Sequence, residues 1–273
     1  MNYFERQEEI KWLSQKKISS TTIAILGMGG IGTNVAIHLA RLGFKKLHLI
    51  DYDVVEASNL NRQTLYSKED IGKKKVHAAK HTLDNLDNLA SEIMAHDYDI
   101  FQDWTQTIEL VKESNFIMNG LDQPEIKRSL IGMLCMKLQT PMIYSGTDPH
   151  SGYSGMILLQ DAKKNSACYE CLQAILPSIP DKNLRKKYNT ENILDFTEID
   201  WEELEAEDFT QLHSGATNII TAMLSSNLAS NLLLQSLHSI NCPNRIIFDL
   251  YETSLEKYYI EKRKDCLVCG EML

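Results

Sequence analysis

Short apolar runs alternate with amphipathic stretches along most of the chain. These short apolar runs predict strands at residues 21–26, 46–50, 92–96, 115–118, 141–144 and 155–159. Between several of these runs, apolar residues recur with a helical period, which predicts helices ending near residue 43 and over residues 73–86 and 125–138. Strands that alternate with helices are typical of βαβ units. The pattern therefore predicts an α/β fold with a doubly wound, mostly parallel, Rossmann-like sheet.

The two ends of the chain and one middle segment depart from this alternation. Residues 1–20 predict a helical arm with apolar positions at Phe4, Ile10, Trp12 and Leu13. The periodicity is weak from about residue 176 to 213, which predicts a long crossover loop with one short helix near residues 201–206. A helix is expected at 214–237, and strands at 245–250 and 257–261. Without repeats or linkers, residues 21–273 are expected to form one domain.

No segment has the pattern of a signal peptide or a membrane span. The N-terminus is charged and amphipathic, without an apolar core region. The longest apolar stretch, residues 219–237, is interrupted by serines and asparagines, which indicates a buried helix. We therefore expect a cytoplasmic protein with no membrane partner.

The charge adds one local feature. The formal net charge is −9, but residues 191–208 hold nine acidic residues and no basic one, so the remainder has 37 − 9 = 28 acids against 28 bases. No basic footprint for nucleic acid is present. The acidic run is interpreted first as a solvated loop, with a mobile lid that recognises a basic partner as the alternative.

A glycine-rich turn follows the first predicted strand. Gly27, Gly29, Gly30 and Gly32 fit the GxGxxG pattern between a strand and a helix, where backbone N–H groups and the helix dipole attract phosphate. Asp51 ends the second strand, 19 residues after Gly32, where a carboxylate holds ribose hydroxyls. The motif predicts a nucleotide site, with NAD as its usual ligand.

Three charged features fit a triphosphate better than NAD. The stretch SNLNRQTL, residues 58–65, places Asn59 and Arg62 close behind Asp51. Lys75 is the last of three consecutive lysines at a predicted helix start, where a cation opposes the helix dipole. Asp122 follows the fourth strand. Cations together with a carboxylate for a metal are what ATP and Mg²⁺ need.

Four of the six cysteines form two CxxC pairs. Cys168 and Cys171 are separated by 94 residues from Cys266 and Cys269. Two such pairs without an export signal favour a closed Cys₄ site for Zn²⁺, with a redox pair or free buried thiols as alternatives. Cys135 stands in an apolar helical pattern and is expected to be a core residue.

These motifs together resemble the ThiF/MoeB/HesA family of ubiquitin-activating-like adenylyltransferases. The resemblance covers nearly the whole chain, from GMGGIG and Asp51-x-Asp53 through SNLNRQTL and GKKKV to Asp122 and the two CxxC pairs. It implies that Asp51 binds ribose, within a nucleotide site that also includes Asp53. It implies phosphate contacts from Asn59, Arg62 and Lys75, and an Mg²⁺ site at Asp122.

The resemblance also implies a homodimer. Arg6 matches an N-terminal arginine that reaches into the other subunit's ATP site, although a surface helix charge is an equal alternative for this residue. The groups expected to act in catalysis are thus Arg6, Arg62, Lys75 and Asp122.

The implied reaction is acyl adenylation with release of pyrophosphate. The expected substrate is the C-terminal carboxylate of a small ubiquitin-like or sulfur-carrier protein, or of a peptide. Residues 172–212 contain no cysteine, so no protein thioester is expected. Peptide-modifying relatives carry an added N-terminal domain, for which the roughly twenty residues before the first strand are too short. A small-molecule carboxylate, an NAD-dependent oxidoreductase and a non-catalytic scaffold remain alternatives.

Overall fold

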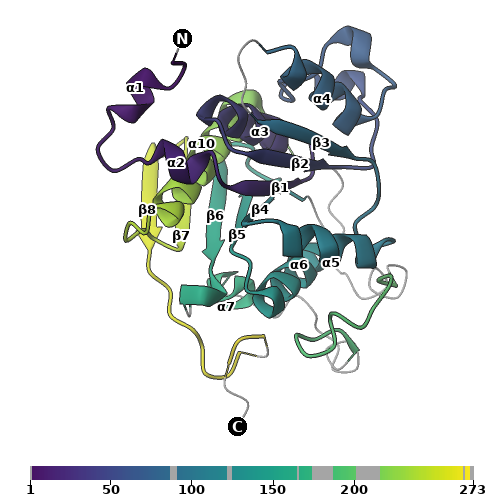
Figure 1. Cartoon of the computed structure of the whole chain (residues 1–273). Coiled ribbons are helices and arrows are strands. Elements are labelled where there is room, and N and C mark those ends of the chain that lie inside the picture. The colour runs from purple at the N-terminus through teal and green to yellow at the C-terminus, as the bar shows by residue number, and fades with distance from the viewer. Residues whose placement is uncertain are drawn as a thin grey trace.

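A computed structural model describes residues 2–86, 91–121, 125–164, 166–173, 187–200, 216–266 and 268–270. Within these residues, one sheet of eight strands has the order β3-β2-β1-β4-β5-β6-β7-β8 (Figure 1). The strands are β1 Thr22–Leu26, β2 Lys46–Ile50, β3 Glu92–His96, β4 Phe116–Asn119, β5 Met142–Thr147, β6 Ser154–Gln160, β7 Arg245–Asp249 and β8 Ser254–Tyr258.

The sheet is parallel from β3 to β5 and antiparallel from β5 to β8. Strand β1 lies between β2 and β4, with Ile25 paired to Leu49 on one side and Met118 on the other. The direction of winding therefore reverses beside β1. Open parallel sheets bind ligands at the carboxyl ends of the strands at such a reversal. The predicted fold class is confirmed.

Helices cover both faces of the sheet and bury two separate apolar cores (Figure 1). One face carries α2 Gln15–Ile18, α3 Gly30–Leu42, α4 Lys75–Asp84 and α10 Ile219–Leu237. The other carries α5 Trp104–Glu113, α6 Glu125–Leu138 and α7 Tyr169–Gln173, together with residues 187–200. Strands buried on both faces need apolar residues at successive positions, which is why β1 reads TIAIL.

Helix α3 is held at both ends by identifiable contacts. At its C-terminus, Gly43 has φ +82°, and its N–H donates to Ala40 O, a conformation that glycine adopts without steric cost. The small side chain of Ala222 on α10 lies beside Gly30 at the start of α3, which lets the two helices approach closely there. The hydroxyl of Ser226 donates to Ile31 O, 3.1 Å away. These contacts fix the N-terminal turn of α3 at the end of β1.

Helix α5 is absent from the sequence prediction. Asp103 caps it by accepting from Gln106 N, and Trp104, Ile108 and Val111 face the core at helical spacing. This spacing was a usable signal. The short helix α7, which contains Cys171, was also unassigned.

The N-terminal helical arm contains two short helices, α1 Glu5–Glu8 and α2, and Trp12 between them is 44% exposed. Two predicted boundaries in the C-terminal part were wrong. Strand β8 begins three residues earlier than expected. All its residues are exposed, so burial does not determine its register. Helix α10 begins at 219 because the Asn218 side chain accepts from Ile220 N and Thr221 N. Residues 201–215, including the short helix expected there, lie outside the described residues.

Among the described residues, no helix combines the length and the apolar character that crossing a membrane requires.

Candidate nucleotide site and cysteine cluster

A cavity of about 510 Å³ opens at the carboxyl ends of β1, β2, β4 and β5. This volume is within the usual range for small-molecule sites. Of the residues predicted for the nucleotide site, its lining includes Gly27, Gly29, Gly30, Asp51, Asp53, Asn59, Arg62 and Lys75. The structure thus brings together residues that lie up to 48 positions apart in the sequence.

The glycine turn lets backbone approach backbone. Gly27 has φ +86°, and a Cβ atom there would lie 3.2 Å from Gly120 O, at the end of β4. A Cβ atom at Gly32 would overlap the carbonyl oxygen of Gly27. Gly32 therefore permits the tight turn and does not line the cavity. The turn leaves the first N–H groups of α3 at the cavity, where they can bind anionic oxygen.

Asp51 is fixed by two backbone hydrogen bonds. Its carboxylate accepts from Met28 N at 2.7 Å and from Asp53 N at 2.8 Å. Burial raises the pKa of Asp51 above its ordinary value, against the opposing effect of nearby Lys75. The carboxylate is thus held in one orientation at the end of β2, where ribose hydroxyls would meet it.

Lys75 is a buried cation between two carboxylates. Its side chain is 9% exposed, and Nζ lies 2.7 Å from Asp53 Oδ2 and 4.0 Å from Asp51 Oδ2. The two preceding lysines point elsewhere: Lys73 pairs with Asp70 and Lys74 with Asp97, outside the cavity. Each of the three lysines thus has a carboxylate partner within the protein, and Lys75 alone of them lines the cavity.

The loop after β2 places three polar residues beside the glycine turn. Asn59 is buried and its Oδ1 accepts from Glu56 N at 3.0 Å. Arg62 Nη1 donates to Ser58 O at 3.0 Å, and the stem of Arg62 packs against Gly30. Gln63 is 4% exposed, and its Oε1 accepts no hydrogen bond from any described residue. Because an unsatisfied buried amide oxygen is unfavourable, Gln63 fits a ligand that donates to it.

Four cavity residues were missed as functional candidates: Gln63, Lys127, Arg128 and Tyr144. Arg128 is 7% exposed, stands over the Tyr144 ring at 4.8 Å, and donates from Nη1 to the Tyr144 hydroxyl. The available signal was a charged residue within the apolar pattern of α6. The sequence could not show which face of α6 meets the cavity.

Arg6 does not reach the cavity of its own chain. Phe4 packs against Gly43, and Gln7 Nε2 donates to Leu42 O at 3.0 Å, so α1 lies at the C-terminal end of α3. The glycine turn is at the opposite end of this 13-residue helix, about 20 Å away. Asp122 lies outside the described residues, although the preceding Gly120 and Leu121 line the cavity.

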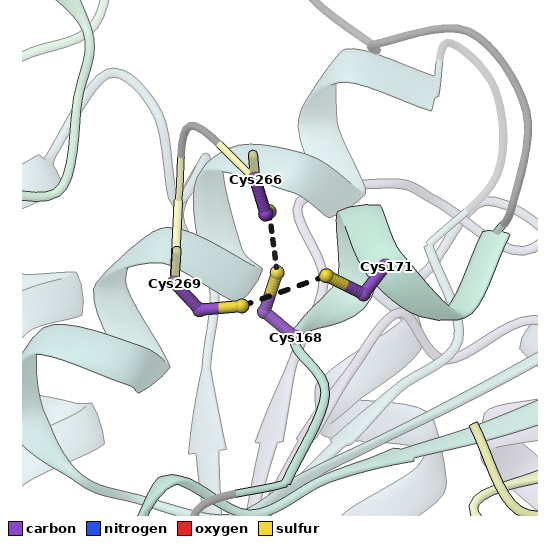
Figure 2. Close-up of side chains that lie close together, drawn as sticks. All are labelled: Cys168, Cys171, Cys266 and Cys269. Carbon is purple, nitrogen blue, oxygen red and sulfur yellow. Dashed lines mark hydrogen bonds between the residues drawn. The ribbon is translucent and has the colours of Figure 1, made fainter. Parts of the chain in front are cut away.

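The four paired cysteines form one cluster away from this cavity. All four Sγ atoms lie within 4.8 Å of one another (Figure 2). The Cys168–Cys266 and Cys171–Cys269 sulfur distances are both 3.5 Å. In a tetrahedron with Zn–S bonds of about 2.3 Å, sulfur atoms are about 3.8 Å apart. The donor set and its spacing therefore fit Zn²⁺.

The cysteine environments differ between this cluster and the core. Hydrogen bonding with Cys168 lowers the pKa of Cys171, whereas hydrogen bonding with Cys171 and Cys266 raises the pKa of Cys168. Cys135 is completely buried in α6, and burial raises the pKa of its thiol well above the ordinary value. Cys135 is thus a packing residue, as expected from its apolar surroundings.

Known proteins are similar to this chain over part or nearly all of its length. The model of the ThiF family matches residues 4–268. The SUMO-activating enzyme subunit 2 of Dictyostelium discoideum is 35% identical over 161 residues, which are 59% of this chain and 23% of that protein. The NEDD8-activating enzyme E1 catalytic subunit of Arabidopsis thaliana is 32% identical over 168 residues, 57% of this chain and 35% of that protein. The matches thus cover about a quarter to a third of these relatives.

Solved structures share the fold. E. coli MccB with MccA-N7isoASN has a TM-score of 0.76 and 23% identity, covering 99% of this chain and 74% of that one. E. coli MccB with ATP has a TM-score of 0.71 and 23% identity, covering 94% of this chain and 68% of that one. Since the family model extends over nearly the entire sequence, and the sheet, glycine turn and cysteine pairs agree with the expected resemblance, this chain belongs to the ThiF family.

Proposed function

We propose that this protein is an ATP-dependent adenylyltransferase that activates a carboxylate as an acyl-adenylate. One observation carries the proposal: the glycine turn, Asp51, Arg62 and Lys75 line one cavity at the reversal point of the sheet. A dinucleotide needs the turn and the acidic residue, but a triphosphate also needs the cations. Membership in the ThiF family supports the same reaction.

Each group in the cavity has a distinct part in this reaction. Asp51 accepts hydrogen bonds from the ribose, and the N–H groups at the start of α3 hold phosphate oxygens. Lys75, Arg62 and Asn59 bind the β- and γ-phosphates and stabilise the pyrophosphate as it leaves. The substrate carboxylate attacks the α-phosphorus, and the bond from this phosphorus to the bridging oxygen breaks. Positioning and charge stabilisation provide most of the catalysis.

Bound Mg²⁺ would neutralise charge on the phosphates, and Asp122 remains the proposed ligand. Asp122 follows Gly120 and Leu121, which line the cavity at the end of β4. Arg6 is proposed to complete the site of a second subunit in a homodimer, because it is remote from the cavity of its own chain.

The proposed substrate is the C-terminal carboxylate of a small ubiquitin-like or sulfur-carrier protein. Relatives named for activating SUMO and NEDD8 support this class. A peptide is the second candidate, because MccB, solved with MccA, shares the fold over 99% of this chain. No described cysteine lines the cavity, and residues 172–212 contain none, in keeping with release of the adenylate without a protein thioester.

The cysteine cluster is proposed to hold a structural Zn²⁺. Four thiolates leave no open position for water, so this ion would stabilise the fold and take no part in the reaction. It would join the C-terminal segment to α7. A cytoplasmic location, where thiols remain reduced, is part of the same proposal.

Exchange of labelled pyrophosphate into ATP tests the activity. The purified protein is incubated with Mg²⁺, ATP and candidate carrier proteins or peptides with free or amidated C-termini. We expect exchange with a free carboxylate and none with its amide. Absence of exchange with every carboxylate tested, together with tight NAD binding independent of Mg²⁺, would overturn the proposal in favour of an oxidoreductase.

A further inference from the structure

Tyr144 and Arg128 form a paired polar group on the wall of the cavity. Tyr144 lies on β5 and is 4% exposed, and Arg128 lies on α6 and is 7% exposed. The guanidinium donates from Nη1 to the phenolic oxygen and also stands 4.8 Å from the ring centroid. Neither residue belongs to the glycine turn or to the cations that follow β2.

The proton of the Tyr144 hydroxyl is available to a ligand. Arginine is a donor and never an acceptor, so the phenolic oxygen is the acceptor in this pair. Across the described part of the chain, no acceptor receives the phenolic proton. A hydroxyl that accepts from a cation becomes a stronger donor itself, because hydrogen bonds in a chain polarise one another. Tyr144 is therefore suited to donate to an anionic oxygen.

The hydroxyl lies at the cavity surface because of a glycine. Gly146 lines the cavity two positions along β5, on the same face as Tyr144. A Cβ atom at Gly146 would overlap the Tyr144 hydroxyl. Any larger residue at 146 would thus displace the hydroxyl from its position beside Arg128.

The order of the strands places this pair on the side from which the carboxylate attacks. Asp51 follows β2, the glycine turn follows β1, and Tyr144 lies on β5 beyond β4. The distance from β2 to β5 is three strand spacings, about 14 Å. The attacking and leaving oxygens lie in line on opposite sides of the phosphorus. With the pyrophosphate held by Arg62 and Lys75, the nucleophile approaches from the β4–β5 side.

We infer that Tyr144, held by Arg128, binds the non-attacking oxygen of the substrate carboxylate and orients it toward the α-phosphorus. This inference rests on the proposed function. The Tyr144 hydroxyl donates to the oxygen that becomes the carbonyl of the acyl-adenylate, so the contact persists in the product. Arg128 acts through Tyr144 and is a positioning residue.

The test measures binding of two nucleotides to the protein by calorimetry. Glycylsulfamoyl adenosine, a stable acyl-adenylate mimic, carries the acyl oxygen, and AMP lacks it. We expect Tyr144→Phe to weaken binding of the mimic about fivefold to tenfold and to leave AMP affinity unchanged. Tyr153→Phe, which removes the hydroxyl of a half-exposed tyrosine outside the cavity, should match the wild type for both ligands.

A second variant keeps both side chains and moves the hydroxyl. Gly146→Ala should weaken binding of the mimic and leave AMP affinity unchanged, as expected for Tyr144→Phe. Thermal unfolding of each variant shows whether the fold is retained. Three results would each overturn the inference. They are an equal loss of affinity for both ligands in the variants, an unchanged affinity for the mimic in Tyr144→Phe, and a wild type that binds the mimic no more tightly than AMP. A wild type that fails to bind ATP would instead overturn the proposed function.

Discussion

Lys75 illustrates how much a single position depends on its environment. Three lysines follow one another in the sequence, and two pair with carboxylates outside the cavity. Lys75 alone of the three is buried at the cavity, 2.7 Å from Asp53. The Asp53 side chain is half exposed, so its contact with Lys75 lies at the cavity surface, where a phosphate could compete for the lysine.

The first prediction concerns this cation. Lys75→Met should reduce pyrophosphate exchange by at least about 100-fold, as expected for the loss of a group that stabilises transition-state charge. Lys73→Met removes a cation that pairs with the buried Asp70 outside the cavity, and its exchange rate should stay within about twofold of the wild-type rate. Similar rates for the two variants would remove Lys75 from the active site.

The second prediction concerns a buried histidine pair. His48 on β2 and His96 on β3 approach to 2.8 Å between Nδ1 and Nε2. Burial, followed by the charge of His96, lowers the pKa of His48 to about 4. In the unfolded chain His48 takes up a proton near pH 6.5, which the folded chain resists, so stability falls as pH drops from about 6.5 toward 4.

Urea unfolding at about pH 7 and about pH 5 checks this dependence. His48→Gln should lose less stability between the two values than the wild type does, because one group that resists protonation has been removed. His77→Gln, which alters an exposed histidine on α4, should behave as the wild type. An unchanged pH dependence in His48→Gln would contradict the prediction.

At the scale of elements, the cysteine cluster links the C-terminal segment to α7 and to the strand that precedes it. Cys168 and Cys171 come from the turn and helix after β6, and Cys266 and Cys269 follow β8 (Figure 2). Strand β8 has exposed side chains and pairs only with β7 among the described strands. Burial of its side chains therefore contributes little to holding it in place. The cluster is placed to retain the tail after this strand.

The third prediction follows from this link. Metal analysis of the purified protein should find about one zinc per chain. Cys269→Ser should lose the zinc, which would lower the free energy of unfolding by a few kcal/mol. At about 2–4 °C per kcal/mol, Tm should fall by about 5 to 10 °C. Cys242→Ser, which changes a half-buried thiol outside the cluster, should retain the metal. A purified wild type that contains no zinc and has the same Tm as Cys269→Ser would refute the site.

At the scale of the whole molecule, the two ends of α3 belong to different sites. Its N-terminus meets the nucleotide cavity, and its C-terminus holds the arm with Arg6, about 20 Å away. A catalytic role for Arg6 would therefore have to be played in the cavity of another subunit. This geometry makes the proposed homodimer testable through its activity.

The fourth prediction uses mixed subunits. Arg6→Ala and Lys75→Met should each be nearly inactive alone. In a dimer of one Arg6→Ala and one Lys75→Met subunit, one of the two sites combines an intact Lys75 with an intact Arg6 from the neighbour. Random mixing makes about half of the dimers mixed, so about a quarter of wild-type activity should be restored. No recovery after verified mixing would show that Arg6 does not act across subunits.

Sequence alone determined the alternation of strands and helices, the glycine turn and the paired cysteines. These features are local: burial on both faces requires continuous apolar strands, and a tight turn requires glycine, whatever the rest of the chain does. The prediction missed helix α5, although its apolar residues have helical spacing. It also misplaced strand β8, where exposure of every side chain removes the pattern that sets the register.

Only the tertiary structure decided which distant side chains share the cavity. Arg128 and Tyr144 belong to different elements, and their meeting depends on how α6 rotates against β5. The same packing separated Lys75 from its two neighbours and placed Arg6 at the far end of α3. Sequence patterns report which face of an element is apolar. The position of a polar side chain within a shared cavity depends on contacts among elements far apart in the chain.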